Sequence, residues 1–120
     1  MQEIKLKRSY DDKEYGDGIR ILVDRLWPRG VKKEALKHDK WIKDIAPSSN
    51  LRQSFHDNND FKTFKSAYIK ELNNNPAAND FSEKVKDILK DRHVTLLFSA
   101  KDTDHNNAVI LKEWLLNKIQ

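Results

Sequence analysis

Residues 19–30 carry the sequence Ile19-Arg20-Ile21-Leu22-Val23-Asp24-Arg25-Leu26-Trp27-Pro28-Arg29-Gly30, in which an aliphatic run ends abruptly in charged, aromatic and turn-forming residues. The aliphatic part contains three β-branched residues and is typical of a strand that is buried on both faces. Because Pro28 has no N–H to donate to a neighbouring strand, the chain leaves the sheet near this position. The charged side chains therefore gather at the carboxyl end of the strand.

Strand and helix patterns recur along the rest of the chain. Further strands are indicated by period-two alternation or by an apolar run, at residues 4–7 and 93–99. Helices are indicated by apolar residues at spacings of three and four, at residues 60–72, 78–90 and 108–119. The first two of these helices are expected to pack antiparallel. Strands that alternate with helices predict an α/β fold with a small, mostly parallel β-sheet flanked by helices, because the helices must cross over between strands.

The shorter segments between these elements follow local signals. Residues 41–46 fit either an extended strand or a helical turn, and the extended form is favoured. Ser48 or Ser49 is a suitable N-cap for a short helix over residues 51–55. Residues 31–38 predict a helical turn at most.

Length and composition indicate one globular domain. With 120 residues, the chain is expected to form a single domain over residues 1–120. It contains 38% hydrophobic and 35% charged residues, and no apolar run approaches the roughly 18 residues of a membrane span. Residues 1–7 alternate charged and apolar side chains and lack the continuous apolar stretch of a signal peptide. We therefore expect a cytoplasmic protein that has no membrane partner.

The cysteine and histidine content excludes several kinds of chemistry. The chain has no cysteine, which rules out disulfides, thiolate nucleophiles, cysteine-bound zinc and iron–sulfur clusters. Its four histidines are scattered singly, so neither a metal nor another cofactor is expected. The net charge of +4 favours anionic partners, but no run of Lys and Arg marks a nucleic-acid tail. Nucleic acid is therefore an unfavoured but open partner.

Two loops carry charged residues at the carboxyl ends of the two central strands. One follows the strand quoted above and contains Arg25 and Arg29; the other, at residues 99–107, contains Lys101 and His105. In open α/β sheets, ligands bind beyond the carboxyl ends of neighbouring strands. If the two strands are neighbours, these four side chains share one crevice that suits a phosphate or a carboxylate.

The start of the last helix supports the same expectation. One of Asp102, Thr103 and Asp104 would cap that helix, whose free N–H groups carry the positive end of the helix dipole. His105 follows directly, where a neutral imidazole could act as a general acid or base. The simpler interpretation of His105 is a solvated surface histidine.

Other candidate side chains also have a structural interpretation. Asp24 could orient Arg25 or act as a base, yet Asp24 and the arginines could instead satisfy one another and fix the turn at residues 27–28. Trp27 could stack on a ligand ring or belong to the core. Ser99 could be a nucleophile, but no flanking glycine forms the sharp turn that such serines occupy.

These residues resemble those of a known family. The chain is similar to the YeaO-like family of small bacterial proteins in the segments Leu22-Val23-Asp24-Arg25-Leu26-Trp27-Pro28-Arg29-Gly30, Ala46-Pro47-Ser48, Val94-Thr95-Leu96-Leu97 and Ala100-Lys101-Asp102. The resemblance implies a compact α/β domain but names no reaction. A similar, longer group has a cysteine near the end of its last strand and a Cys-His-Arg cluster after it. This chain has no cysteine there, so the resemblance transfers Asp24 and Arg25 but no thiol chemistry.

The sequence therefore predicts a cytoplasmic α/β domain whose crevice recognises a small molecule that bears a phosphate or carboxylate. The candidate ligand-binding residues are Arg25, Arg29, Lys101, His105 and Trp27. Asp24 and His105 are the candidates for catalysis, and whether any reaction is catalysed stays open. The alternative is a non-enzymatic module that binds nucleic acid or protein, in which residues 24–30 are purely structural.

Overall fold

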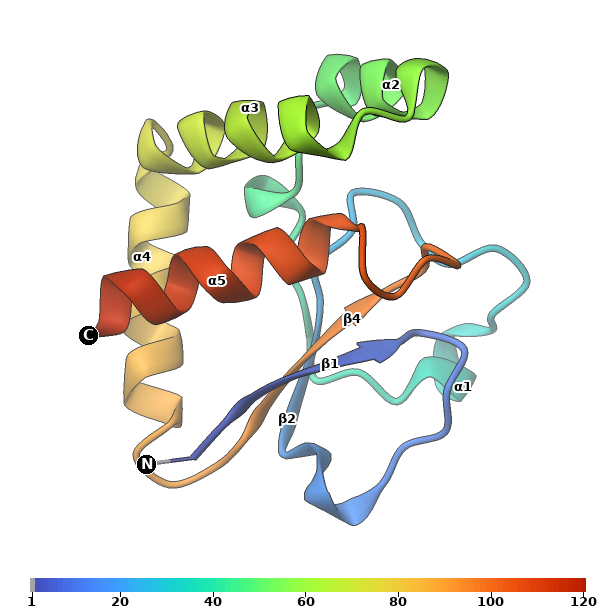
Figure 1. Cartoon of the computed structure of the whole chain (residues 1–120). Helices are drawn as coiled ribbons and strands as arrows, with labels where there is room; N and C mark the ends of the chain where they lie inside the picture. The colour runs from blue at the N-terminus through green and yellow to red at the C-terminus, as the bar shows by residue number, and fades with distance from the viewer. Residues whose placement is uncertain (1) are drawn as a thin grey trace.

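Four strands form one parallel sheet, in which the last strand of the chain lies between the first two. The computed structural model describes residues 2–120 (Figure 1). The strands are β1 (Ile4–Arg8), β2 (Ile19–Leu22), β3 (Lys40–Trp41) and β4 (Val94–Phe98). The order across the sheet is β1-β4-β2-β3, and each neighbouring pair is parallel. The predicted α/β class is confirmed, and β2 and β4 are neighbours.

Five α-helices and two short 3-10 segments connect these strands within the described residues. In chain order they are η1 (Tyr15–Asp17), α1 (Lys33–Leu36), η2 (Lys43–Ile45), α2 (Ser49–Asn58), α3 (Phe61–Asn73), α4 (Pro76–Ile88) and α5 (Asn107–Ile119). The three long helices predicted from apolar spacing begin and end within two residues of the expected positions. α2 is longer than predicted, because the chain turns away only at Asn59, where φ is 51°.

The ambiguous segment at residues 41–46 is extended only at its start. β3 is short, and η2 follows because the N–H of Ala46 donates to the carbonyl of Lys43 (3.0 Å). Ser48 then caps α2 by accepting the N–H of Leu51 (3.2 Å), which confirms one of the two predicted caps.

The predicted cap of the last helix is wrong. α5 is capped by Asn106, whose side chain accepts the N–H of Val109 (3.0 Å), and not by any of residues 102–104. Asp102 instead accepts two backbone N–H groups of the preceding loop, so its side chain closes a turn before the helix begins. Asp102, Thr103, Asp104 and Asn106 all have short side chains that can accept the capping hydrogen bond, so the sequence does not distinguish them. The hydrogen bonds within the loop place Asn106 at the cap.

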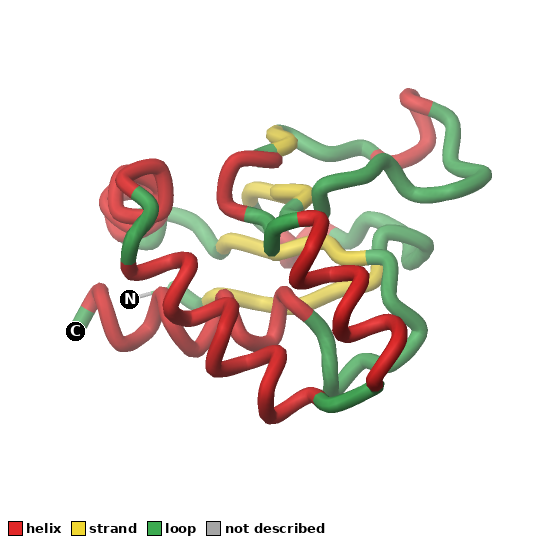
Figure 2. Tube along the Cα trace, turned by 90° about the horizontal axis from the view of Figure 1, so that it is seen from above, coloured by secondary structure: helices red, strands yellow, loops and turns green. Residues whose placement is uncertain are grey.

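Helices α2 to α5 bury the main core against one face of the sheet (Figure 2), whereas α1 packs on the other face. Ile21 and Val23 point to the face of the main core, as do Leu96 and Phe98 of β4, because side chains alternate along a strand. α4 crosses the end of α3 and does not fold back along it, so the predicted antiparallel packing is wrong. α4 begins at Pro76, directly after its N-cap Asn75. The side-chain amide of Asn75 donates to the carbonyl of Asp44 (2.8 Å), which anchors the start of α4 at this place in the fold.

The opposite face of the sheet carries a buried ion network beside a smaller apolar cluster. Arg20, at 1% exposure, forms an ion pair with Asp17, at 5% exposure. The Arg20 guanidinium also donates to the carbonyls of Leu36 (2.9 Å) and Lys37 (3.0 Å). Lys7 completes the network from β1 with a second ion pair to Asp17 (3.1 Å). The strand is therefore buried on both faces, but an arginine occupies part of the second face.

Gly18 allows β2 to begin directly beside β4. Its φ is 66°, a left-handed conformation that favours glycine. A Cβ atom at this position would overlap the carbonyl of His93. That carbonyl accepts the N–H of Ile19 (2.9 Å), so the close approach belongs to the sheet itself.

Candidate functional site

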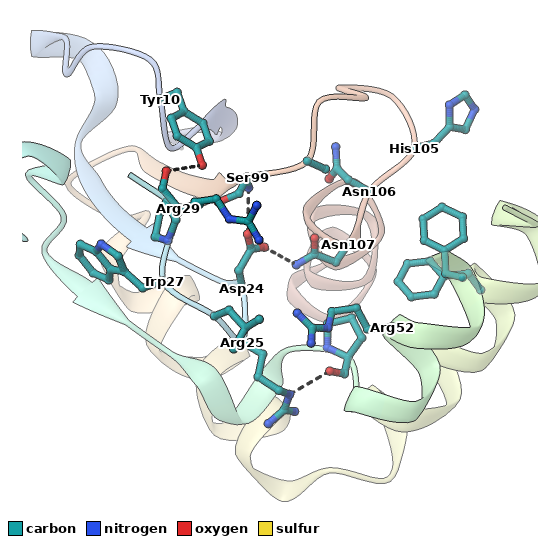
Figure 3. A pocket seen from close by; sticks show the side chains of 16 residues that line it. Tyr10, Asp24, Arg25, Trp27, Arg29, Arg52, Ser99, His105, Asn106 and Asn107 are labelled. Carbon is teal, nitrogen blue, oxygen red and sulfur yellow. Dashed lines mark hydrogen bonds between the residues drawn. The ribbon is translucent and has the colours of Figure 1, made fainter. Parts of the chain in front are cut away.

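A cleft of about 370 Å³ opens at the carboxyl ends of β2 and β4. It lies where the loop after β2, the loop between β4 and α5, and α2 meet (Figure 3). The two loops that were expected to converge do so, because their strands are paired. The lining residues are Tyr10, residues 24–29, Pro47, Arg52, Phe55, Phe64, Ser99, Ala100 and residues 105–107.

Asp24 lies at the centre of the cleft in Figure 3, two positions after the last residue of β2. Its carboxylate accepts the backbone N–H of Ser99 (2.8 Å) and the side-chain amide of Asn107 (3.0 Å). Burial raises the pKa of Asp24, and the hydrogen bonds from Asn107 and Ser99, with the charge of Arg52, offset this effect only in part. Asp24 thereby ties the end of β2 to the end of β4 and the start of α5.

Arg25 is occupied by the backbone. Its Nε donates to the carbonyl of Pro47 (3.1 Å), and its Nη2 donates to the carbonyl of Ala46 (3.1 Å). Within residues 2–120, neither Arg25 nor Arg29 forms an ion pair with Asp24. The alternative interpretation, in which Asp24 and the arginines satisfy one another, is therefore wrong, and Arg25 instead fixes the connection before α2.

The turn that follows β2 is held by its tryptophans. Trp27 Nε1 donates to the carbonyl of Val31 (2.6 Å), and Trp41 Nε1 donates to the carbonyl of Asp24 (2.8 Å). The two indole rings pack edge to face, with centroids 5.4 Å apart, and both belong to the smaller apolar cluster with Leu22. Trp27 therefore belongs to a core and also contributes to the cleft lining.

Arg29 and Arg52 line the cleft with guanidinium groups that have no partner among the described residues. Arg29 is held through its backbone carbonyl, which accepts the Tyr10 hydroxyl (2.9 Å), and Arg52 through its backbone N–H, which donates to Ser48 (2.9 Å). Among residues 2–120, neither guanidinium donates a hydrogen bond or forms an ion pair. Figure 3 shows the two arginines on different sides of Asp24.

The loop between β4 and α5 contributes less than predicted. His105 lines the cleft, but its ring points away from Asp24 (Figure 3). Its Nδ1 lies 3.0 Å from Asp102 Oδ2, and the ring packs edge-on against Phe61, with centroids 5.0 Å apart. Lys101 is exposed and does not line the cleft, because it lies in the outer turn that Asp102 closes. The expectation of four basic side chains in one crevice is therefore wrong for Lys101.

Sequence reasoning missed the polar side chains of Tyr10, Arg52 and Asn107 and the apolar side chains of Pro47, Phe55 and Phe64, all of which line this site. Asn107 is the first residue of α5, and the cap at Asn106 could have indicated its position. The cap at Ser48 likewise places Arg52 in the first turn of α2. No local pattern indicates which way α2 faces, so Arg52 is found only from the packing.

The described part of the chain gives little support for a serine nucleophile, a metal site or a membrane-spanning helix. The Ser99 hydroxyl lies 2.8 Å from the Ser9 hydroxyl, and no hydrogen bond joins it to His105. Within residues 2–120, no group of three or more acidic or histidine side chains could hold a metal ion. No helix in the same range has the length and apolar character needed to cross a membrane.

The fold and the cleft define a small parallel α/β domain with a ligand-sized cavity at the carboxyl edge of its sheet. Residues 3–120 match the family described as the inactive DUF488-N3 subclade, and the chain belongs to this family. It is 47% identical over 113 residues to the uncharacterized protein YeaO of Escherichia coli K12, which covers 93% of this chain and 96% of that protein. The resemblance to the YeaO-like family is confirmed.

More distant relatives occur in mycobacteria. The chain is 40% identical over 75 residues to an uncharacterized protein of Mycobacterium bovis, covering 62% of this chain and 64% of the relative. The same values hold for an uncharacterized protein of Mycobacterium tuberculosis. No solved structure matches the chain.

Proposed function

We propose that this domain binds a small molecule that bears a phosphate or carboxylate group, and that it does so in the cleft at the ends of β2 and β4. The observation that carries the proposal is the pair of guanidinium groups, Arg29 and Arg52, that line the cleft without a partner in residues 2–120. A guanidinium is a planar fork of N–H donors that matches the two oxygens of a carboxylate or phosphate. Two such groups on different sides of one cavity suit a small anion.

The rest of the lining suits an organic molecule. Phe55 and Phe64 contribute stacked aromatic rings, with centroids 4.4 Å apart, and Pro47 adds a further apolar side chain. The volume of about 370 Å³ falls within the range of roughly 300–1,000 Å³ that is usual for ligand sites. We expect the apolar body of the ligand to lie against these side chains while its acidic group contacts the arginines.

The proposal is one of binding. The candidates for catalysis, Asp24 and His105, do not face each other, since the His105 ring pairs with Asp102 and points away from Asp24. The description of the family as inactive agrees with a binding role. No reaction is therefore assigned to the site.

A melting-temperature screen tests the proposal. The probes are inorganic phosphate, 5′-mononucleotides and monocarboxylates with and without an aromatic ring. At least one probe should raise the melting temperature. Arg29→Gln and Arg52→Gln should each lower the affinity for that probe roughly tenfold to a hundredfold, the usual effect of losing a hydrogen bond to a charged group. Absence of any shift across the panel contradicts the proposal.

Two comparisons make the screen specific. Arg92→Gln removes one positive charge from an exposed residue that does not line the cleft, and it should leave the affinity unchanged. Equal losses of affinity in Arg29→Gln, Arg52→Gln and Arg92→Gln would indicate a general effect of net charge.

The alternative role in nucleic-acid binding predicts that an oligonucleotide binds at low salt and is released as the salt concentration rises. Arg25→Ala is unsuitable as a probe, because it also removes two bonds to the backbone.

A further inference from the structure

The cleft contains one acidic side chain, Asp24, among otherwise basic, apolar and neutral polar lining residues. Within residues 2–120, no lysine, arginine or histidine forms an ion pair with its carboxylate. Its two partners, the N–H of Ser99 and the amide of Asn107, are both neutral donors. The described residues therefore hold a largely buried carboxylate that forms no ion pair, and the charge of Arg52 offsets its burial only in part.

This carboxylate can accept more hydrogen bonds than it receives. An ionised carboxylate offers about four acceptor positions, and the protein fills one on each oxygen of Asp24. A buried charge without a partner is unfavourable, and the raised pKa of Asp24 has this cause. A cationic group that enters the cleft would remove the unfavourable interaction.

The neighbouring charged groups do not meet this need. Arg25 donates to two backbone carbonyls, and His105 points away and pairs with Asp102. The Tyr68 hydroxyl of α3 donates to the carbonyl of Ile45 (2.6 Å). The remaining cations of the lining are Arg29 and Arg52, neither of which forms an ion pair with Asp24.

We infer that the ligand is a zwitterion of the amino-acid type, whose ammonium group binds Asp24 and whose acidic group binds Arg29 and Arg52. The inference rests on the proposed function, because it uses the same cleft and the same arginines. The aromatic rings of Phe55 and Phe64 favour an apolar side chain on the ligand. An aminocarboxylate and an aminophosphate share the required chemistry.

Matched probes separate the contributions of the two charges. We would measure, by calorimetry, the binding of phenylalanine, 3-phenylpropionate and 2-phenylethylamine, and of leucine, 4-methylpentanoate and isopentylamine. Phosphoethanolamine and ethyl phosphate form the aminophosphate arm. In at least one arm, the zwitterion should bind the wild-type protein roughly tenfold to a hundredfold more tightly than the analogue that lacks the amino group. This comparison needs no variant, so it does not depend on whether a substitution folds.

The variant Asp24→Asn tests the residue itself. Its side-chain oxygen can still accept the N–H of Ser99, but the bond from the Asn107 amide is lost because an NH2 group replaces the other oxygen, so circular dichroism must first show that the variant is folded. The zwitterion should lose roughly tenfold or more in affinity, whereas the analogue without an amino group should bind equally well or more tightly, since a negative charge has been removed. Arg52→Gln should weaken both ligands.

The outcomes distinguish the two proposals. If the acids without an amino group bind the wild-type protein as tightly as the zwitterions, or if Asp24→Asn weakens both to the same extent, the zwitterion inference is wrong while the anion site stands. If neither zwitterions nor simple anions bind the wild-type protein, both proposals fail.

Discussion

Replacing Arg20 with methionine should destabilise the domain by about 3–5 kcal/mol, the usual loss when one partner of a buried ion pair is removed. Arg20 is 1% exposed, and its guanidinium contacts Asp17 and two backbone carbonyls. Methionine replaces the aliphatic part of the side chain but not the guanidinium, so the space that the buried guanidinium fills adds a cavity cost to the loss of the ion pair. The loss is a large share of a domain's total stability, which is about 5–15 kcal/mol.

A second variant divides this loss into parts. In Arg20→Lys the charge opposite Asp17 is kept, but the bonds to the carbonyls of Leu36 and Lys37 are lost. At about 0.5–1.5 kcal/mol for each hydrogen bond, the expected loss is about 1–3 kcal/mol. Urea unfolding monitored by tryptophan fluorescence measures both values. The control is Arg92→Met, at an exposed position, which should change the free energy of unfolding by less than about 0.5 kcal/mol. A loss below about 1 kcal/mol in Arg20→Met would show that the ion network does not support the sheet.

Three further predictions concern the fold. Gly18→Ala should strongly destabilise the domain or prevent folding, because the new Cβ meets the His93 carbonyl and the residue has a positive φ. Gly16→Ala should lower the melting temperature only slightly, because its Cβ meets only the end of the Lys5 side chain (3.4 Å). Burial alone would raise the pKa of Asp17, but the N–H of Glu14 and the side chains of Lys7 and Arg20 outweigh it and hold the pKa below its usual 3.8. The contribution of Asp17 to stability is therefore present above pH 3.8 and lost as the pH falls through the folded-state pKa. The free energies of urea unfolding at pH 3 and pH 7 should differ less in Asp17→Asn than in the wild-type protein. Tyr68→Phe should cost about 1–3 kcal/mol in urea unfolding, because it leaves the carbonyl of Ile45 without its donor, and an unchanged free energy would contradict the buried hydrogen bond.

The helices and central strands could be predicted because their apolar residues repeat at the period of the element itself. Residues 60–72 illustrate this, since α3 (Phe61–Asn73) buries Phe64, Tyr68 and Leu72 on one face. The burial of Arg20 could not be predicted in the same way. Its partners come from the end of η1 and from the end of α1, and no local pattern places them beside the strand.

The candidate site was predictable to the extent that it follows from strand order. Parallel neighbours end at the same edge of a sheet, so Asp24, Arg29 and Ser99 were placed near one another by topology alone. Lys101 was misplaced because Asp102 closes an outward turn, and that choice depends on hydrogen bonds within the loop. Arg52 was missed because its place in the site depends on how α2 packs.

The position of β4 between β1 and β2 affects how the chain folds during synthesis. Ile4 and Ile19 both pair with Val94, so the first two strands are joined only through a strand made much later. Such long-range pairing slows folding, since a long loop must close before the contacts form. A nascent chain that ends after α4 would present two unpaired strand edges at once, and such edges associate readily with other chains. Premature release on the ribosome should therefore yield aggregating fragments, and the sheet should assemble only after residue 98 has left the exit tunnel.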